Sequence, residues 1–197
     1  EIHVDISNLE EKENLVYENS LEEFERKDRI VFLGGDHSIS YSIGRAFLEN
    51  CGREGREACL IVFDSHADCC ISGKNPNNEE WLRSLIEHGF DAENVLLVGA
   101  RNLWQEEIEF LARNKIKRIS MNELNNNLEE ITDVIMEFAN GKELYLSFDI
   151  DVVDMAFAPS TSYPEPSGLS SRQAVYIISR MSKMKNLRAF DLVEVDI

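Results

Sequence analysis

The sequence has no apolar run that approaches the roughly 20 residues needed to cross a bilayer. It is also poor in basic residues, with 20 Lys and Arg against 37 Asp and Glu and a formal net charge of −17. Such an acidic excess repels phosphate backbones and anionic lipids, so we expect neither nucleic acid nor a membrane as a partner. It favours a cationic small molecule, or metal ions held by carboxylates. Many charges, such as those at 10–13, are nevertheless expected on solvated helix faces.

A thiolate zinc site is unexpected as well, because the cysteines form no Cys-x-x-Cys pair. Two of them are adjacent and cannot easily bond to each other. We therefore expect four free thiols in a reducing cytoplasm, at Cys51, Cys59, Cys69 and Cys70. Linkers rich in proline or serine, repeats and low-complexity segments are absent too, so residues 1–197 are expected to form a single domain.

What the chain does have is a regular alternation of short apolar runs with amphipathic stretches. The apolar runs predict strands at 2–6, 29–33, 59–63, 94–99, 116–120, 143–148 and 187–192. The amphipathic stretches predict helices at 9–26, 39–49, 78–87, 103–113, 128–140 and 171–184. This alternation is typical of an α/β fold with three layers, a mainly parallel sheet covered by helices on both faces. Ligands of such folds bind beyond the carboxyl ends of the strands.

Three of the predicted strands run directly into polar sequence. The polar segments are GGDHS at 34–38, DSHAD at 64–68 and SFDID at 147–151. Alternate residues of extended backbone share a face, so Asp64, His66 and Asp68 are predicted to converge, as are Asp149 and Asp151. Taken singly, each motif has another explanation, such as a turn before a helix, a capping pair or a hydrogen-bonded histidine. All three together, each after an apolar strand, favour one shared site that includes His37.

The residue types in these motifs indicate a metal centre. Four carboxylates brought close together repel one another and would be protonated unless cations neutralise them. Two divalent ions, held about 3.5–4 Å apart by bridging carboxylates, would do so. Ligation by carboxylate and imidazole without thiolate suits a hard ion such as Mn²⁺. A water shared by two such ions loses a proton near neutral pH and becomes a nucleophile.

With these motifs in this order, the chain resembles the ureohydrolase family, which comprises arginases, agmatinases and formiminoglutamases. Further matches are VGAR at 98–101, the loop at 157–166 and DLVEV at 191–195. The resemblance implies an arginase-like fold and two manganese ions per subunit. By this resemblance, one ion takes His37 and Asp68, the other takes His66 and Asp151, and Asp64 and Asp149 bridge them.

The resemblance also implies how the site would work. A bridging hydroxide would attack the carbon of a guanidinium or amidine group, and Asp68 would relay a proton to the leaving nitrogen. Glu194 would hold the cationic substrate by a charge-assisted contact; the alternative for Glu194 is a solvated charge at a strand end. A homo-oligomer, a trimer or a hexamer, is implied as well.

Two substrate-side positions depart from the family pattern. Asn78 stands where a proton-shuttling histidine is usual, and it can form hydrogen bonds but cannot titrate. Tyr163 stands where a small hydroxyl residue usually faces the substrate, and its ring could narrow the pocket or stack on a planar cation. Relatives also carry elements before residue 2 and after Glu194, so the sequence is expected to be truncated at both ends.

Two other functions remain open at this stage. One is a hydrolase of another amide-type bond with a single zinc, as in deacetylases of similar fold. The other is a family member that binds metal but has little or no catalytic activity, which the changes at Asn78 and Tyr163 motivate.

Overall fold

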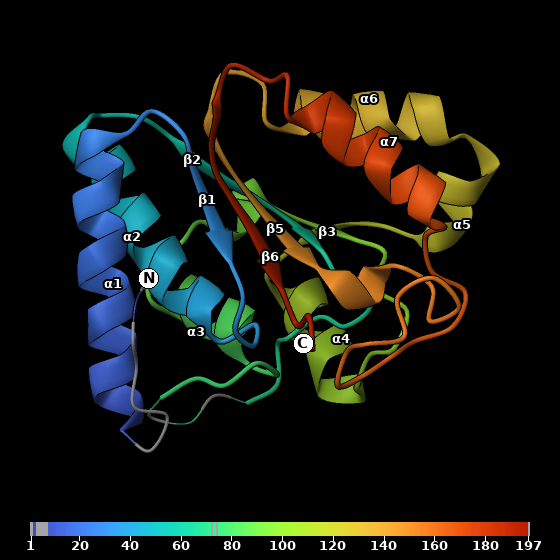
Figure 1. The fold of residues 1–197 in the computed structure, drawn as a ribbon, viewed down its shortest axis with the longest axis horizontal. Helices are drawn as coiled ribbons and strands as arrows, with labels where there is room; N and C mark the ends of the chain where they lie inside the picture. The colour runs from blue at the N-terminus through green and yellow to red at the C-terminus, as the bar shows by residue number, and fades with distance from the viewer. Residues whose placement is uncertain (1, 3–7, 72, 74, 197) are drawn as a thin grey trace.

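The computed structural model describes residues 2, 8–71, 73 and 75–196. Its centre is a six-stranded sheet in the order β1-β6-β5-β2-β3-β4, and every neighbouring pair is parallel (Figure 1). The strands are β1 (Ile30–Leu33), β2 (Ala58–Phe63), β3 (Val95–Val98), β4 (Lys117–Ile119), β5 (Glu143–Asp149) and β6 (Leu187–Val193). Because all six are parallel, their carboxyl ends lie at one edge of the sheet.

Helices cover both faces of this sheet (Figure 1). One layer holds α1 (Leu9–Arg26), α2 (Ile39–Arg53), α3 (Trp81–Glu87) and α4 (Gln105–Arg113). The other holds α5 (Met121–Asn126), α6 (Leu128–Phe138) and α7 (Ser171–Met181). Alternate residues of β2 divide between the two cores: Leu60 and Val62 face α1–α4, whereas Ile61 and Phe63 face α5–α7. The predicted three-layer α/β/α fold is therefore confirmed.

The predicted elements differ from the observed ones mainly at their ends. Helix α3 begins at Trp81 rather than at residue 78, and α4 begins at Gln105 after Trp104 as its N-cap. Helix α2 continues four residues beyond the predicted end, to Arg53. The six-residue helix α5 was not predicted, because a segment this short shows little periodicity. The strand predicted at 2–6 lies, apart from Ile2, outside the described residues.

The sheet is not covered equally along its width. The central strands β2 and β3 are buried throughout, which explains their continuous apolar sequence. Strand β1 lies at one edge, and its alternate residues Val31 and Leu33 are exposed. Within the described residues, no helix combines the length and the apolar character that crossing a membrane requires.

Candidate metal centre

A small cavity lies beyond the carboxyl ends of β1, β2, β5 and β6, four neighbouring strands of the sheet. It brings together eight of the nine residues that the sequence indicated. Its lining consists of His37, His66, Asp68, Asn78, Asp149, Asp151, Thr161, Tyr163 and Glu194. The ninth predicted residue, Asp64, is buried beside them, with Oδ2 3.0 Å from Nδ1 of His37.

Three carboxylates surround the imidazole of His37. Its Nδ1 lies 3.0 Å from Oδ2 of Asp64, 3.0 Å from Oδ2 of Asp68 and 3.1 Å from Oδ2 of Asp149. All four side chains are buried. Three carboxylate oxygens thus lie within 3.1 Å of one imidazole nitrogen, and we call these four residues the His37 group.

A second set of ligand atoms surrounds His66. Its Nδ1 lies 2.8 Å from Oδ2 of Asp151 and 3.6 Å from Oδ1 of Asp64. We call His66, Asp64 and Asp151 the His66 group. Asp64 belongs to both groups and directs one carboxylate oxygen to each, as a bridging ligand must. Asp149 contacts only His37 among the two histidines, so its predicted bridging role stays a prediction.

The donors present fit divalent cations. Nδ1 of His37 and Oδ2 of Asp64 are buried and lack a hydrogen-bond partner, although both are strongly polar. The atoms of His37, Asp64 and Asp149, and those of Asp64, His66 and Asp151, lie close enough within each set to hold one ion. No thiolate is among them. The set is therefore one of imidazole and carboxylate donors, which suits a hard or borderline metal ion.

In the metal-free cluster, the pKa values of the carboxyl groups show that their negative charges have to be neutralised. Burial, followed by the charge of Asp64, raises the pKa of Asp68 to about 8. The same two causes raise the pKa of Asp149 and of Asp151. Burial also opposes ionisation of Asp64, but contacts with His37 and His66 outweigh it and lower that pKa. Without cations, this cluster therefore takes up protons instead.

The backbone brings the ligands together differently from the sequence-based argument. Alternation along extended backbone was the wrong reason for their convergence, because both motifs leave the strand. Asp68 has a φ of 52°, in the left-handed region, and the Asp64 side chain accepts a 2.7 Å hydrogen bond from the N–H of His66. Asp151 lies in the 3₁₀ helix η2 (Ile150–Val152). The backbone N–H of Asp151 donates a hydrogen bond to Oδ1 of Asp149. Tight turns, not a pleated strand, aim these side chains.

A buried polar network supports the His37 group from the sheet side. Nε2 of His37 lies 2.9 Å from Oγ of Ser147, and that hydroxyl donates to Oδ1 of Asp191 at 2.9 Å. Because the carboxylate can only accept, Ser147 gives it the hydroxyl hydrogen and accepts from the Nε2–H of His37. With Nε2 donating to Ser147, Nδ1 is the nitrogen that is available to a metal ion. Asp191 also accepts hydrogen bonds from Ser40, Tyr145 and the backbone of Phe148.

The substrate-side residues lie at the rim of the cavity. Oε1 of Glu194 accepts a 2.7 Å hydrogen bond from the N–H of His37, and burial raises the pKa of this carboxyl. Tyr163 is 54% exposed, and its ring stands edge-on to His66 with centroids 6.3 Å apart. Thr161 is buried, and its hydroxyl has no hydrogen-bond partner. Asn78 lines the same cavity.

Sequence reasoning did not identify several residues that shape this site. They are Trp81, Ser147, Thr161, Glu165 and Asp191. Ser147 lies inside the SFDID motif and Asp191 inside DLVEV, so the motif boundaries could have drawn attention to them. No local pattern marks Trp81 or Thr161, which reach the site only through the folded chain. Glu165 lies 3.7 Å from Nε2 of His66 and accepts from the Asn102 amide at 2.7 Å.

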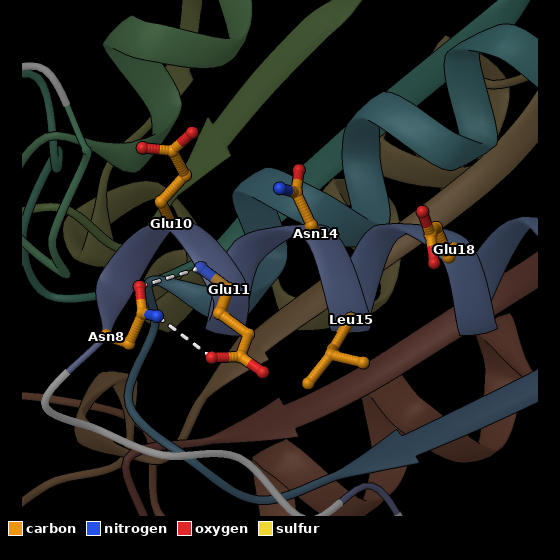
Figure 2. A pocket seen from close by; sticks show the side chains of 6 residues that line it. All are labelled: Asn8, Glu10, Glu11, Asn14, Leu15 and Glu18. Atoms are coloured by element: carbon orange, nitrogen blue, oxygen red, sulfur yellow. Dashed lines mark hydrogen bonds between the residues drawn. The ribbon is translucent and has the colours of Figure 1, made fainter.

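A second surface hollow, on α1, is a weaker candidate for a functional site. It is lined by Asn8, Glu10, Glu11, Asn14, Leu15 and Glu18 (Figure 2). All six residues come from one helix and its cap. Asn8 caps α1, because its side chain accepts from the N–H of Glu11 and donates to the Glu11 carboxylate (Figure 2). The geometry here is explained by helix capping.

Comparisons with known proteins agree with the geometry. A sequence profile described as the Arginase family matches residues 1–196. The chain is 30% identical to the arginase of Emericella nidulans over 188 residues, which cover 83% of this chain and 57% of that protein. It is 33% identical to the guanidinobutyrase of Pseudomonas aeruginosa over 169 residues, which cover 83% of this chain and 51% of that one. It thus spans little more than half the length of these two relatives.

Solved structures show the same fold. The proclavaminate amidino hydrolase of Streptomyces clavuligerus superimposes with a TM-score of 0.88 at 23% identity, over 99% of this chain and 65% of that one. A hypothetical agmatinase from Burkholderia thailandensis gives a TM-score of 0.85 at 27% identity, over 98% and 60% of the two chains. Together with the profile match over nearly every residue, these findings show that the chain belongs to the arginase family.

Proposed function

We propose that this chain is a hydrolase with two manganese ions that cleaves a C–N bond of a guanidino or amidino compound. The observation that carries the proposal is the pair of ligand groups that share Asp64, with a buried nitrogen and a buried oxygen lacking any partner. The names of the relatives, arginase and guanidinobutyrase, support this substrate class.

The His37 group would hold one ion and the His66 group the other. Asp64 would bridge them, and we keep Asp149 as the second bridging ligand on the family resemblance. When bound, the two ions would lower the pKa of a shared water enough for it to attack the trigonal carbon of the substrate. The C–N bond would then break, and the leaving amine would take up a proton.

Asp68 is the residue that we propose for that proton transfer. It lines the cavity, and the family resemblance gives this aspartate the role of relaying the proton to the leaving nitrogen. Asn78 lies at the same cavity but cannot exchange a proton. Asp68 would therefore act without the help of a titrating side chain at position 78.

The rim would bind the cationic part of the substrate. Glu194 supplies a carboxylate, and a charge-assisted contact with a guanidinium is stronger than a neutral hydrogen bond. The hydroxyl of Thr161 is buried without a partner and would bond to a polar group of the substrate. Asn78 and the ring of Tyr163 would complete the binding surface. The proposal therefore names a substrate class, guanidino and amidino compounds.

Metal analysis combined with an activity panel tests the proposal. The protein, purified with and without added Mn²⁺, should bind two ions per chain and release urea or ammonia from arginine, agmatine, guanidinobutyrate or formiminoglutamate. Asp149→Ala should lose both metal and activity. One zinc per chain would support the deacetylase-like alternative instead. Two ions with calorimetric binding of a guanidine but no turnover would indicate the member with little activity.

Further properties follow from the family resemblance and belong to the same proposal. We propose that residues 1–197 act as a single metallohydrolase domain in the cytoplasm, and that the chain assembles into a homo-oligomer, a trimer or a hexamer. All four cysteines are free, as a reducing compartment requires. Light scattering on the purified protein measures the oligomeric state directly, and a monomer would contradict the assembly.

A further inference from the structure

A tryptophan contacts the His37 group directly. Trp81 is the first residue of α3 and is fully buried. Its indole N–H donates a 2.7 Å hydrogen bond to Oδ2 of Asp68. Its ring also lies against the imidazole of His37, with centroids 4.6 Å apart and planes inclined by 36°. One side chain thus contacts two residues of the same ligand group.

The hydrogen bond selects one oxygen of the carboxylate. The Oδ2 atom of Asp68 that accepts from the indole is also the atom 3.0 Å from Nδ1 of His37. A carboxylate oxygen has room for an N–H donor and a cation at once, since it carries two lone pairs. The indole therefore holds Oδ2 toward Nδ1 of His37 and leaves Oδ1 outside this contact.

The backbone of Asp68 is held by the same helix. Its carbonyl oxygen accepts from the N–H of Leu82 at 3.2 Å and from the N–H of Arg83 at 3.3 Å. These are N–H groups of the first turn of α3, which have no partner inside the helix. Asp68 itself has a φ of 52°, which a residue with a side chain rarely adopts without such support. The first turn of α3 therefore holds Asp68 at both its backbone and its side chain.

The His66 group has a different aromatic neighbour. Tyr163 is more than half exposed and meets the edge of the His66 ring at a centroid distance of 6.3 Å. No hydrogen bond joins Tyr163 to a carboxylate of that group among the contacts of the described residues. The contrast indicates that the ligands of the His37 group are oriented by their aromatic neighbour, whereas those of the His66 group are not.

We propose that Trp81 is a positioning residue that orients Asp68 and His37, and that it sets the affinity of the His37 group for its ion. The inference rests on the proposed metal-binding function. Groups that orient metal ligands in this way commonly change metal affinity by about 10–100-fold when they are replaced. A tryptophan that only fills the core would leave metal affinity unchanged and act on stability alone.

The first experiment replaces Trp81 by Phe, which keeps an aromatic ring beside His37 and removes the N–H donor. Mn²⁺ titration followed by calorimetry should show one of the two binding events weakened by about 10–100-fold and the other unchanged. The matched control is Trp104→Phe, because Trp104 is 70% exposed and lies outside the site; it should bind both ions normally. Unchanged affinity for both ions in Trp81→Phe would overturn the proposal.

The second experiment does not depend on the folding of the Trp81 variant. The chain has two tryptophans, so in Trp104→Phe all indole fluorescence comes from Trp81. Added Mn²⁺ should change this emission in step with one binding event, and that event should be the one removed by His37→Asn. The assignment of Trp81 to the His37 group would be contradicted by an emission change that follows the binding event removed by His66→Asn. It would also be contradicted by emission that follows neither binding event.

These outcomes are separable from those for the proposed function. Two bound ions without hydrolysis of any guanidine would end the proposed function and leave the role of Trp81 intact. Hydrolysis of a guanidine, with equal metal affinity in wild type and Trp81→Phe, would support the proposed function and overturn the role of Trp81. A wild-type protein that binds no Mn²⁺ would overturn both.

Discussion

The two ligand groups of this site differ in what surrounds them. The imidazole of His37 is 1% exposed and sits between a buried indole and a buried serine–aspartate network. The imidazole of His66 is 24% exposed, and its neighbours Glu165 and Tyr163 come from a loop. One group is held by the sheet and a helix, and the other borders the opening of the cavity. Substitutions near His37 should therefore affect metal binding and stability, whereas substitutions near His66 should affect access and substrate binding.

The largest effect is expected where the two groups meet. Asp64 is the residue that both groups share, so Asp64→Asn should abolish the binding of both ions and reduce activity below detection. The loss should exceed the ~10–100-fold typical of residues that only orient a ligand. Metal content by elemental analysis and urea release measure it. One tightly bound ion remaining in this variant would show that the groups are independent, contrary to the shared carboxylate.

A pair of supporting carboxylates provides the next test. Asp191 is fully buried and accepts four hydrogen bonds, whereas Glu165 is partly exposed and lies 3.7 Å from His66. Disrupting a buried charged network by changing one partner costs about 3–5 kcal/mol, and an exposed ion pair contributes about 0–1 kcal/mol. Each kcal/mol shifts the melting temperature of a chain this long by about 2–4 °C.

Asp191→Asn should therefore lower the melting temperature far more than Glu165→Gln. It should also weaken Mn²⁺ binding, because the amide nitrogen of Asn would face the hydroxyl donors Ser40 and Tyr145. Rearrangement of this network would disturb Ser147 and thereby the tautomer of His37. Thermal melts of both metal-free variants, followed by Mn²⁺ titration, measure the two effects. If Asp191→Asn and Glu165→Gln lowered the melting temperature equally, the surroundings of the His37 group and of the His66 group would contribute equally to stability.

The same contrast explains how much could be predicted from the sequence. Burial repeats with the period of each element, so strands and helices could be recognised locally, and among the α-helices of the described residues only the short α5 was missed. The ligand residues could be recognised because each motif follows a strand whose parallel neighbours end at the same edge. The turns that orient these ligand side chains could not be predicted. The left-handed backbone of Asp68 depends on N–H groups of α3, which lie fourteen and fifteen residues further along the chain. Trp81 and Thr161 carry no motif, and only tertiary contacts assign them.

The pH should change how strongly metal stabilises the protein. The pKa of Asp68 is raised to about 8 by burial and the charge of Asp64; burial would lower the pKa of His66, but contacts with Asp151 and Asp64 bring it to about 11. Both groups hold a proton more tightly in the metal-free folded state than in the unfolded chain. The stabilising contribution of Asp68 in the metal-free protein is therefore lost as pH rises from about 4 to 8, and that of His66 as pH rises from about 6.5 to 11.

Metal binding competes with these protons, so affinity for Mn²⁺ should rise over the same range. The increase in melting temperature caused by a fixed Mn²⁺ concentration should be larger at pH 8 than at pH 6. A ligand at 100 times its dissociation constant stabilises a protein by about 2.7 kcal/mol, which gives the expected scale at the higher pH. Thermal melts with and without Mn²⁺ at the two pH values measure the difference. An equal shift at both would mean that the ligands carry no exchangeable protons.

The smallest effect is expected at the open side of the His66 group. Tyr163 contacts no ligand by a hydrogen bond among the described residues, so Tyr163→Thr should leave Mn²⁺ affinity and kcat unchanged. Its exposed ring can still interact with a planar cation, a contact worth about 0.5–1 kcal/mol, so KM for the best guanidine should rise about two- to fivefold. Phe157→Thr is the matched control, because Phe157 is equally exposed and does not line the cavity. If Tyr163→Thr instead weakened Mn²⁺ binding as strongly as Trp81→Phe, the two groups would depend on their aromatic neighbours alike, and the distinction between a supported and an open half of the site would fail.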